Sequence, residues 1–330
     1  MSLRPCYGSA FGFPAVLKSP LGLHWKMLPF KLIYSDRYDL NLGDHVFPSS
    51  KYRRIRENLL ESQLASVTDF LEPQPASDTD VLLVHTAEWV RKLKTGTLDP
   101  GEIYRMEVPY SPELVQAVWL CAGGSVLAAR HALTDGVAVN MGGGFHHAFP
   151  GHGEGFCVIH DVAIAIRKLQ TEGAIQRAMT VDLDVHHGNG TAFIFARDSS
   201  VFTYSMHQEH NYPLEKPPSD LDIHLPDGCE DEQYLHLLRE NLHHALAVFQ
   251  PDLIFYLAGA DPYREDQLGG LALTKQGLQE RDRIVFAMAR ERNVPVAVTF
   301  AGGYARRLED TLAIHVGTVR AALQTVEQPS

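Results

Sequence analysis

The stretch Ala178–Gly190, AMTVDLDVHHGNG, begins as a short apolar run and ends in alternating carboxylates and imidazoles. Its first part, Ala178–Val185, predicts a β-strand that is covered on both faces, as the central strands of a parallel sheet are. Similar apolar runs, such as VLLV, LIFYL and VAVTF, recur along the chain and are separated by segments of helical length. This alternation predicts an α/β fold with one doubly wound, mostly parallel central sheet flanked by helices.

Seven strands and five helices follow from these patterns. The predicted strands are Leu28–Ser35, Asp80–His85, Gly136–Met141, Ala178–Val185, Val201–Ser205, Asp252–Leu257 and Pro295–Phe300. The predicted helices are Tyr52–Leu71, Pro112–Ala132, Asp161–Gln170, Glu232–Phe249 and Lys275–Arg292. Ser111 and Thr274 stand where the N-caps of two of these helices belong. No linker rich in Gly, Ser or Pro divides the chain, so we expect a single folded domain.

The first 26 residues differ from the rest of the chain. They contain Gly, Pro and scattered aromatic residues without a period, and Pro14 interrupts their one apolar stretch, which fits a signal peptide poorly. Met27 stands immediately before the first predicted strand. We therefore expect residues 1–26 to be a disordered extension or an upstream alternative start, and residues 27–330 to form the folded domain.

Composition excludes several classes of protein. The 29 Lys and Arg against 40 Asp and Glu give a net charge of −11, which repels polyanions, so nucleic acid is not an expected partner. No apolar run approaches the roughly 20 residues needed to span a bilayer, and we expect a cytoplasmic protein without a membrane span. The four cysteines are far apart and form no CxxC pair, which argues against a disulfide framework or a thiolate zinc site. The sequence does not indicate an oligomeric state.

Polar side chains collect where five of the predicted strands end. In open α/β sheets the ligand site lies beyond the carboxyl ends of the strands. The residues in these positions are His146 and His147 in GGGFHHA, Asp182, Asp184, His186, His187 and Asn189 in VDLDVHHGNG, Met206 and His207 after Val201–Ser205, Asp261 in AGADP, and Tyr304 in AGGY. The sequence therefore predicts one active site at this edge of the sheet.

A metal site is the chemistry that these residues favour. Asp184 and His186 are two residues apart, so both project to one face of an extended segment, and Asp182 lies one step back on that face. Asp261, at the end of another strand, supplies a third ligand. Two carboxylates and one imidazole with open positions suit a catalytic Zn²⁺, and Fe²⁺ as well. The alternative is that each Asp only caps a following helix.

The other histidines fall into two groups. His146 and His147 follow three glycines, which allow the backbone to approach the site closely. His243 and His244 lie within a predicted helix and are interpreted as surface or groove residues without a catalytic role. His236 and His315 receive the same interpretation.

In their order and spacing, several motifs resemble the arginase/deacetylase superfamily, and more narrowly the zinc-dependent histone deacetylases and their bacterial relatives. The motifs are GGGFHHA, GFCVIHD, VDLDVHHGNG, AGADP, LGGLALTKQG and AGGY, and the resemblance extends from about Lys31 to Val326. The segments MHQEHNYP and DQLGGLALTKQGLQERD are most similar to the class IV branch.

The resemblance implies roles for the residues at the strand ends. Asp184, His186 and Asp261 would bind the metal. His147 would be the base that takes a proton from water and later delivers one to the leaving amine. His146, held by Asp182, would act electrostatically, and the hydroxyl of Tyr304 would donate to the carbonyl oxygen as it becomes an oxyanion.

Further residues match the family around this centre. Asn189 stands where several members have Asp, and a neutral amide orients the ring of the base without stabilising its imidazolium, so we expect a lower pKa for that base. Phe156 resembles a wall of the acyl-lysine tunnel, Gly155 the carbonyl that accepts the substrate amide N–H, and Tyr212 the opposite wall. Ser205 and Met206, with Asp182, Asp184 and His186, match an inner monovalent-cation site for which potassium is expected.

Three further features concern the surroundings of the expected site. His160 stands where the family often has Asn, and we expect it behind the tunnel. The segment Asp36–Pro48, at the expected rim, has no clear counterpart. Cys157, beside Phe156, is interpreted as a small buried thiol.

The expected function is removal of acyl groups, acetyl or longer, from lysine side chains in peptides or proteins. An acetylpolyamine amidohydrolase acting on a small acylated amine is the alternative within the same chemistry. Ureohydrolysis fits less well, because that branch needs more aspartates for a two-metal cluster. A catalytically silent acyl-lysine binding module would have lost the tyrosine or a metal ligand, and neither is missing here.

Overall fold

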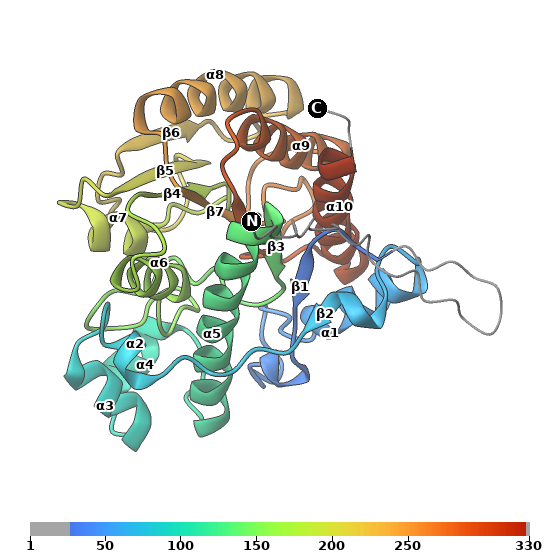
Figure 1. The fold of residues 1–330 in the computed structure, drawn as a ribbon. Coiled ribbons are helices and arrows are strands. Elements are labelled where there is room, and N and C mark those ends of the chain that lie inside the picture. The colour runs from blue at the N-terminus through green and yellow to red at the C-terminus, as the bar shows by residue number, and fades with distance from the viewer. Residues whose placement is uncertain (1–26, 328–330) are drawn as a thin grey trace, which may run out of the picture.

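The computed structural model describes residues 27–327 as an α/β domain (Figure 1). The predicted extension over residues 1–26 lies outside the described residues. Eight strands form one sheet in the order β2-β1-β3-β8-β7-β4-β5-β6, and every neighbouring pair is parallel. The strands are β1 (Lys31–Ile33), β2 (Phe70–Leu71), β3 (Val137–Asn140), β4 (Ala178–Asp182), β5 (Val201–Gln208), β6 (Leu221–Leu225), β7 (Leu253–Leu257) and β8 (Val296–Thr299). The predicted fold class is confirmed.

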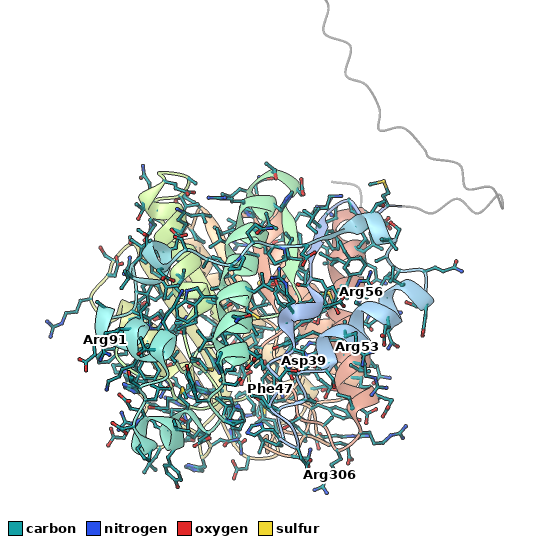
Figure 2. All side chains as sticks on the ribbon, turned by 90° about the horizontal axis from the view of Figure 1, so that it is seen from below. Asp39, Phe47, Arg53, Arg56, Arg91 and Arg306 are labelled. Atoms are coloured by element: carbon teal, nitrogen blue, oxygen red, sulfur yellow. The ribbon has the colours of Figure 1, made fainter. Side chains whose placement is uncertain are left out.

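Helices cover both faces of the sheet. Within residues 27–327 they are α1 (Lys51–Glu61), α2 (Asp78–Val81), α3 (Ala87–Thr95), α4 (Pro100–Met106), α5 (Pro112–Asp135), α6 (Asp161–Thr171), α7 (Asn189–Phe195), α8 (Asp231–Phe249), α9 (Lys275–Glu291) and α10 (Leu308–Glu327). Figure 1 shows α5 and α6 on one side of the sheet and α8, α9 and α10 on the other. The buried apolar residues form two clusters, because central strands with continuous apolar runs bury residues on both faces. Charged side chains such as Arg91 and Arg306 extend into solvent at the periphery (Figure 2).

The caps predicted for two helices are present. Ser111 Oγ accepts the backbone N–H of Leu114 at the start of α5, at 3.0 Å. Thr274 Oγ1 accepts that of Gly277 at the start of α9, at 2.9 Å. In both cases the side chain satisfies a donor that has no partner inside the first helical turn.

The prediction of a strand over Asp80–His85 was wrong. The segment begins inside α2, where Ser77 Oγ accepts the N–H of Asp80 and the Asp80 carboxylate accepts that of Ser77. This reciprocal capping box starts a helical turn. Two of the apolar residues that suggested a buried strand, Leu82 and Leu83, are 45% and 38% exposed. Local capping therefore outweighs the apolar pattern here.

Two further segments differ from their predictions. The helix predicted over Tyr52–Leu71 ends at Glu61, and Gln63 is in a left-handed conformation just beyond it. A 3₁₀ turn, Val67–Asp69, and the short strand β2 follow. Strand β6 was not predicted, because its sequence LDIHL mixes polar and apolar residues, as an edge strand does.

Helix α5 is long and apolar enough to span a membrane by length and composition. It is the one such helix in the described part of the chain, and 72% of its most apolar window is buried inside the domain. Its residues contribute to both apolar clusters. A helix that is apolar on most sides and covered by its own domain is typical of a protein core.

The register of the sheet aligns the carboxyl ends of the central strands. Asp182, the last residue of β4, pairs with Leu257 on β7 and with Ser205 on β5. Leu257 pairs with Thr299 on β8, which pairs with Asn140 on β3. The loops that follow β3, β4, β7 and β8 therefore leave the sheet side by side and carry most of the polar residues singled out in the sequence. β5 continues past this level to Gln208, so Met206 and His207, which were predicted to follow the strand, lie on it.

Candidate active site

Asp184, His186 and Asp261 form a buried group that fits a divalent cation. One ligand atom from each lies within 4.8 Å of the others. His186 Nδ1 is 3.0 Å from Asp184 Oδ1 and 3.5 Å from Asp261 Oδ2. Asp261 Oδ1 accepts the backbone N–H of Val185, whereas its Oδ2 is buried without a hydrogen-bond partner within residues 27–327. An orphaned carboxylate oxygen beside an imidazole and a second carboxylate is a donor set that zinc or ferrous iron accepts.

The surroundings of this group also favour a cation. Burial and the charge of Asp184 raise the pKa of Asp261 to about 7. Two buried carboxylates this close repel one another unless a positive charge joins them. A Cβ atom at Gly302 would lie 2.0 Å from Asp261 Oδ2 and 2.6 Å from Asp184 Oδ2. The glycine leaves the carboxylates room, and its N–H donates to Asp184 Oδ2 at 2.8 Å.

His146 and His147 lie side by side next to this group, with ring centroids 4.0 Å apart. His146 Nδ1 is 2.7 Å from Asp182 Oδ2. Burial lowers the pKa of His146, but the nearby charges of Asp182 and Asp184 outweigh burial and raise it to about 9. The structure therefore pairs a cationic imidazole with the carboxylate at the end of β4.

His147 has a neutral partner. Its Nδ1 lies 2.7 Å from Asn189 Oδ1, and Asn189 Nδ2 donates to Glu154 Oε1 at 2.7 Å. Because a carboxylate accepts only from the NH₂ side of the amide, the carbonyl oxygen of Asn189 must face His147, whose Nδ1 then carries the proton. Burial and the neighbouring His146 lower the pKa of His147 well below its usual value. Its Nε2 is therefore free to accept a proton. The effect expected from an amide in place of a carboxylate at Asn189 stays a prediction, because burial and the neighbouring histidines cause this shift in pKa.

The glycines before the histidines are needed for their loop. Gly143 and Gly144 have φ of 83° and 82°, in the left-handed region that favours glycine. The Asp161 carboxylate anchors the loop by accepting the N–H groups of Gly144 and Phe145 at 3.0 and 2.8 Å. This anchor holds the two following histidines in position.

A cavity of about 160 Å³ opens onto these groups. It is lined by Glu107, His147, Gly155, Phe156, His186, Asn211, Tyr212, Leu268 and Tyr304. The rings of Phe156 and Tyr212 flank it, with centroids 6.0 Å from Tyr304 and 4.9 Å from His147. The structure thus brings together Gly155, Phe156 and Tyr212, the tunnel residues proposed from the sequence, although they come from two separate segments.

Tyr304 projects into the cavity from the loop after β8. Its ring centroid is 6.3 Å from that of His186, and its N–H donates to Asp266 Oδ2 at 2.7 Å. Burial and the charges of Asp184 and Asp261 raise the pKa of Tyr304 well above its usual value. The hydroxyl therefore stays protonated and is available as a donor.

Sequence reasoning missed two aromatic rings that pack against Phe156 in the cavity wall. His45 and Phe47 come from the segment Asp36–Pro48, and their rings lie 4.9 and 6.4 Å from that of Phe156. Phe47, labelled in Figure 2, is also 6.0 Å from Tyr304. The only signal in the sequence was the position of the segment between β1 and the first long helix.

Lys51 is a second residue that sequence reasoning missed. It is fully buried at the first position of α1, and its Nζ donates to Ala301 O at 2.7 Å. Burial lowers the pKa of Lys51 to about 8, although Asp261 and Asp184 oppose the shift. A buried ammonium beside two carboxylates offsets part of their charge, and no motif marks such a residue.

Ser205 and Met206, two of the proposed monovalent-cation ligands, lie on β5, the neighbour of β4. Ser205 pairs with Asp182 in the sheet register, and Met206 is the next residue of β5. Both are buried. Ser205 Oγ lies 2.9 Å from His207 Nδ1. The potassium site itself stays a prediction.

The remaining histidines divide into exposed and buried ones. His236, His243 and His244 are exposed on α8, as expected. The interpretation of His315 as a surface or groove residue was wrong, because it lies on α10 beneath the sheet and its ring stacks on Phe300 with centroids 4.5 Å apart. His160 caps α6, with Nδ1 accepting the N–H of Ala163.

Cys157 is buried beside the cavity wall, in agreement with its interpretation as a small core thiol. Burial raises the pKa of this thiol well above its usual value. The protonated form is poorly nucleophilic.

Comparison with known proteins agrees with this geometry. A family model described as the histone deacetylase domain matches residues 45–319. An uncharacterised protein of Picosynechococcus is 42% identical over 294 residues, which cover 89% of this chain and 98% of that protein. Histone deacetylase 2 of Arabidopsis thaliana is 33% identical over 302 residues, covering 88% of this chain and 78% of that protein.

Solved structures give the same result. An HDAC homologue from Aquifex aeolicus has a TM-score of 0.76 at 25% sequence identity, covering 91% of this chain and 85% of that one. The fold, the family model and the relatives agree. The chain therefore belongs to the histone deacetylase family, and its chemistry is that of a deacetylase.

Proposed function

We propose that this protein is a metal-dependent amidohydrolase that removes acyl groups from the Nε-amino group of lysine in peptides or proteins. One observation carries the proposal: a single cavity of about 160 Å³ is lined at once by His147, His186 and Tyr304. A base, a metal ligand and a hydroxyl donor therefore face the same small space. This is the arrangement that attack of water on an amide carbonyl requires.

Asp184, His186 and Asp261 would hold the ion. When bound, the ion would polarise the acyl carbonyl and lower the pKa of a coordinated water. We assign the ion as Zn²⁺, with Fe²⁺ as the alternative for the same donors. We assign a structural K⁺ to Asp182, Asp184, His186, Ser205 and Met206.

The residues around the cavity would carry out the proton transfers. His147 accepts a proton from the attacking water at Nε2, since Asn189 keeps the other proton on Nδ1. It then delivers a proton to the leaving amine. His146, cationic beside Asp182, stabilises negative charge without transferring a proton itself. Tyr304 donates its hydroxyl hydrogen to the substrate oxygen as charge develops there.

The aromatic walls would select the substrate. Phe156 and Tyr212 would enclose the methylene chain of lysine, and the carbonyl of Gly155 would accept the amide N–H. Gly155 has φ of 52°, and a Cβ there would lie 2.8 Å from both His147 Cδ2 and Tyr212 Cε1. The glycine allows the backbone to approach the cavity this closely.

A small acylated polyamine is the second candidate substrate. Glu107 lines the cavity, and the side chain of Glu154 is partly exposed beside Tyr212. Carboxylates at the mouth would attract a distal ammonium group. A peptide substrate would not need that charge.

We further propose that the enzyme is of the class IV type and acts in the cytoplasm.

Amine release from three substrates tests the proposal. Zinc-loaded protein would be given an acetyl-lysine peptide, a matched long-chain acyl-lysine peptide and acetylputrescine, each with a chelated control. Chelator-sensitive turnover of an acyl-lysine peptide is expected, and the preferred chain reports the depth of the cavity. Turnover of acetylputrescine alone would indicate that the protein is an acetylpolyamine amidohydrolase. Silence on all three with metal bound would contradict hydrolysis altogether.

A further inference from the structure

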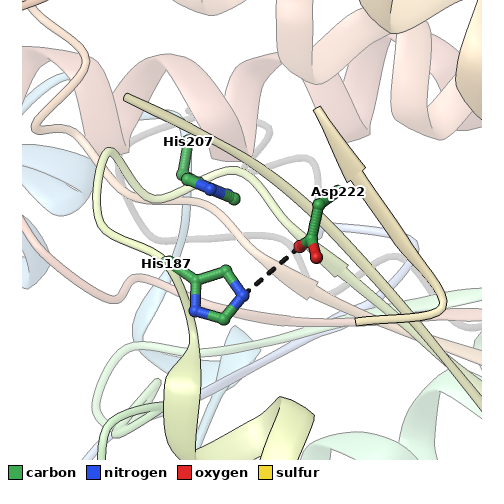
Figure 3. Close-up of side chains that lie close together, drawn as sticks. All are labelled: His187, His207 and Asp222. Carbon is green, nitrogen blue, oxygen red and sulfur yellow. Dashed lines mark ion pairs between the residues drawn. The ribbon is translucent and has the colours of Figure 1, made fainter. Parts of the chain in front are cut away.

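A second cluster of potential metal ligands lies near the open edge of the sheet. It consists of His187, at the end of the VDLDVHH stretch, His207 on β5 and Asp222 on β6, and is called the edge cluster below. Figure 3 shows the three side chains converging from three segments of the chain. The edge cluster shares no residue with the group formed by Asp184, His186 and Asp261.

The distances within the edge cluster suit a single ion. One ligand atom from each residue lies within 4.8 Å of the others. His187 Nε2 is 3.3 Å from Asp222 Oδ1, and the rings of His187 and His207 have centroids 4.7 Å apart. Both histidines are fully buried, and the Asp222 side chain is 16% exposed. Two imidazoles and a carboxylate are ligands that zinc and its neighbours in the first transition row share.

A fourth ligand stands beside the cluster. β5 and β6 pair so that His207 lies opposite His224, and His207 Nε2 is 3.0 Å from His224 Nδ1. His224 and Asp222 are two residues apart on one strand, so both project to the same face. The His224 side chain is exposed, which gives an ion a route from solvent.

The hydrogen bonds around the cluster leave ligand atoms free. Ser205 Oγ lies 2.9 Å from His207 Nδ1, and Ser219 N–H donates to the other oxygen of Asp222 at 2.9 Å. Outer contacts of this kind orient metal ligands in proteins. Asp222 Oδ1 and His187 Nδ1 are buried without a hydrogen bond in the described part of the chain, and Asp222 Oδ1 has only the ion pair with His187 Nε2 at 3.3 Å. Buried polar atoms are usually hydrogen-bonded, so both atoms leave room for a further partner.

We propose that His187, His207 and Asp222 bind a second divalent transition-metal ion, with His224 as the fourth ligand. The ion would be structural. It would join the edge strand β6 to β5 and to the loop that carries His186, without contact with substrate. This site goes beyond the proposed hydrolysis and does not depend on it.

Metal stoichiometry of the full chain tests this proposal. Protein stripped with a chelator would be reloaded with Zn²⁺, desalted and analysed for zinc per chain by mass spectrometry. We expect about two ions for the wild type, about one for Asp222→Asn and about one for Asp261→Asn. The double variant should hold close to none. One ion in the wild type and none in Asp261→Asn would overturn the proposal.

Two controls keep the result interpretable. His236→Asn removes an exposed histidine on α8 and should leave two ions, so a loss there would indicate adventitious surface binding and overturn the proposal. His224→Asn keeps three ligands and should weaken the second site by about tenfold in a chelator competition.

Visible absorption of bound Co²⁺ tests for the second site without relying on enzyme activity. Co²⁺ loaded into the Asp261→Asn variant should give the visible absorption of a four-coordinate nitrogen and oxygen site. The same variant with Asp222→Asn should give none. Equal spectra from the two proteins would overturn the assignment even if both are inactive.

Discussion

Glu154 lies one amide group away from the ring of His147. Asn189 bridges them, with its Oδ1 2.7 Å from His147 Nδ1 and its Nδ2 2.7 Å from Glu154 Oε1. Burial raises the pKa of Glu154, but hydrogen bonds from His152, Asn189 and Tyr212 lower it overall, so the group is a carboxylate. A negative charge is thus present behind the base, although its immediate partner is neutral.

Replacing Glu154 by Gln should lower the activity without disturbing the site. The amide oxygen can still accept from Asn189, while the charge that stabilises the imidazolium of His147 is lost. We expect kcat/KM to fall roughly fivefold, about 1 kcal/mol, because the carboxylate is partly exposed and acts through an intermediate group. The acidic limb of the pH–rate profile should also move to lower pH. Rates and a profile identical to those of the wild type would contradict the relay.

Moving the charge next to the ring should have the opposite effect. The double variant Asn189→Asp with Glu154→Gln places one carboxylate directly on His147 Nδ1 and keeps the total charge. A carboxylate stabilises the imidazolium, so the pKa of His147 should rise. His147 would then become protonated, and stop acting as a base, at a higher pH than in the wild type. The expected shift of the acidic limb is about 1 pH unit. A limb that stays in place would show that His147 is not the group that titrates.

Tyr304→Phe should reduce turnover strongly while the metal stays bound. The loss of one donor to the developing oxyanion costs on the order of 10²–10³ in kcat. Tyr212→Phe is the matched control, because that hydroxyl donates to Glu154 at 3.2 Å. It should change kcat less than about fivefold. Zinc content and kcat measured on the same samples would separate the two effects, and similar losses in both variants would refute the assignment of Tyr304.

Stability should depend on pH through His85, away from the active site. Burial lowers the pKa of His85 to about 4, whereas an unfolded chain titrates near its usual 6.5. Between these values the unfolded chain binds more protons, so the free energy of unfolding falls as pH decreases from about 6.5 to 4. The contribution is about 3 kcal/mol.

Urea unfolding at several pH values would measure this loss. The variant His85→Gln should be less sensitive to pH over the same range, and His236→Gln on the exposed face of α8 should behave like the wild type. Equal pH dependence of His85→Gln and the wild type would rule His85 out as the cause.

The central sheet and the strand ends could be predicted because their signals are local. Ala178–Val185 shows its apolar run and its polar end within a few residues, and the chemistry of Asp184 and His186 follows from their spacing of two. Segments with weaker local signals were misread. In Asp80–His85 the capping box of Ser77 decided the structure, and β6 carries a mixed pattern because only one neighbour pairs with it.

The partners of the site residues could not be read from the sequence. Glu154 is 35 residues from Asn189, and Lys51 is 250 residues from the carbonyl that it binds. Their roles arise from burial and charge in three dimensions. His315 shows the same limit, since a histidine on an unpredicted helix gave no indication that it packs beneath the sheet.

The close approach of Gly302 to the two carboxylates also limits how this sequence can vary. Alanine is the smallest possible replacement, and its methyl group would clash with carboxylate oxygens of the catalytic centre. We therefore expect position 302 to accept no residue other than glycine. Gly317, in the middle of α10, meets nothing within 4 Å of an added Cβ. Alanine there is free to enter and would favour the helix. We therefore expect Gly302 to be fixed and Gly317 to be open to substitution. Directed evolution of this enzyme should leave Gly302 unchanged.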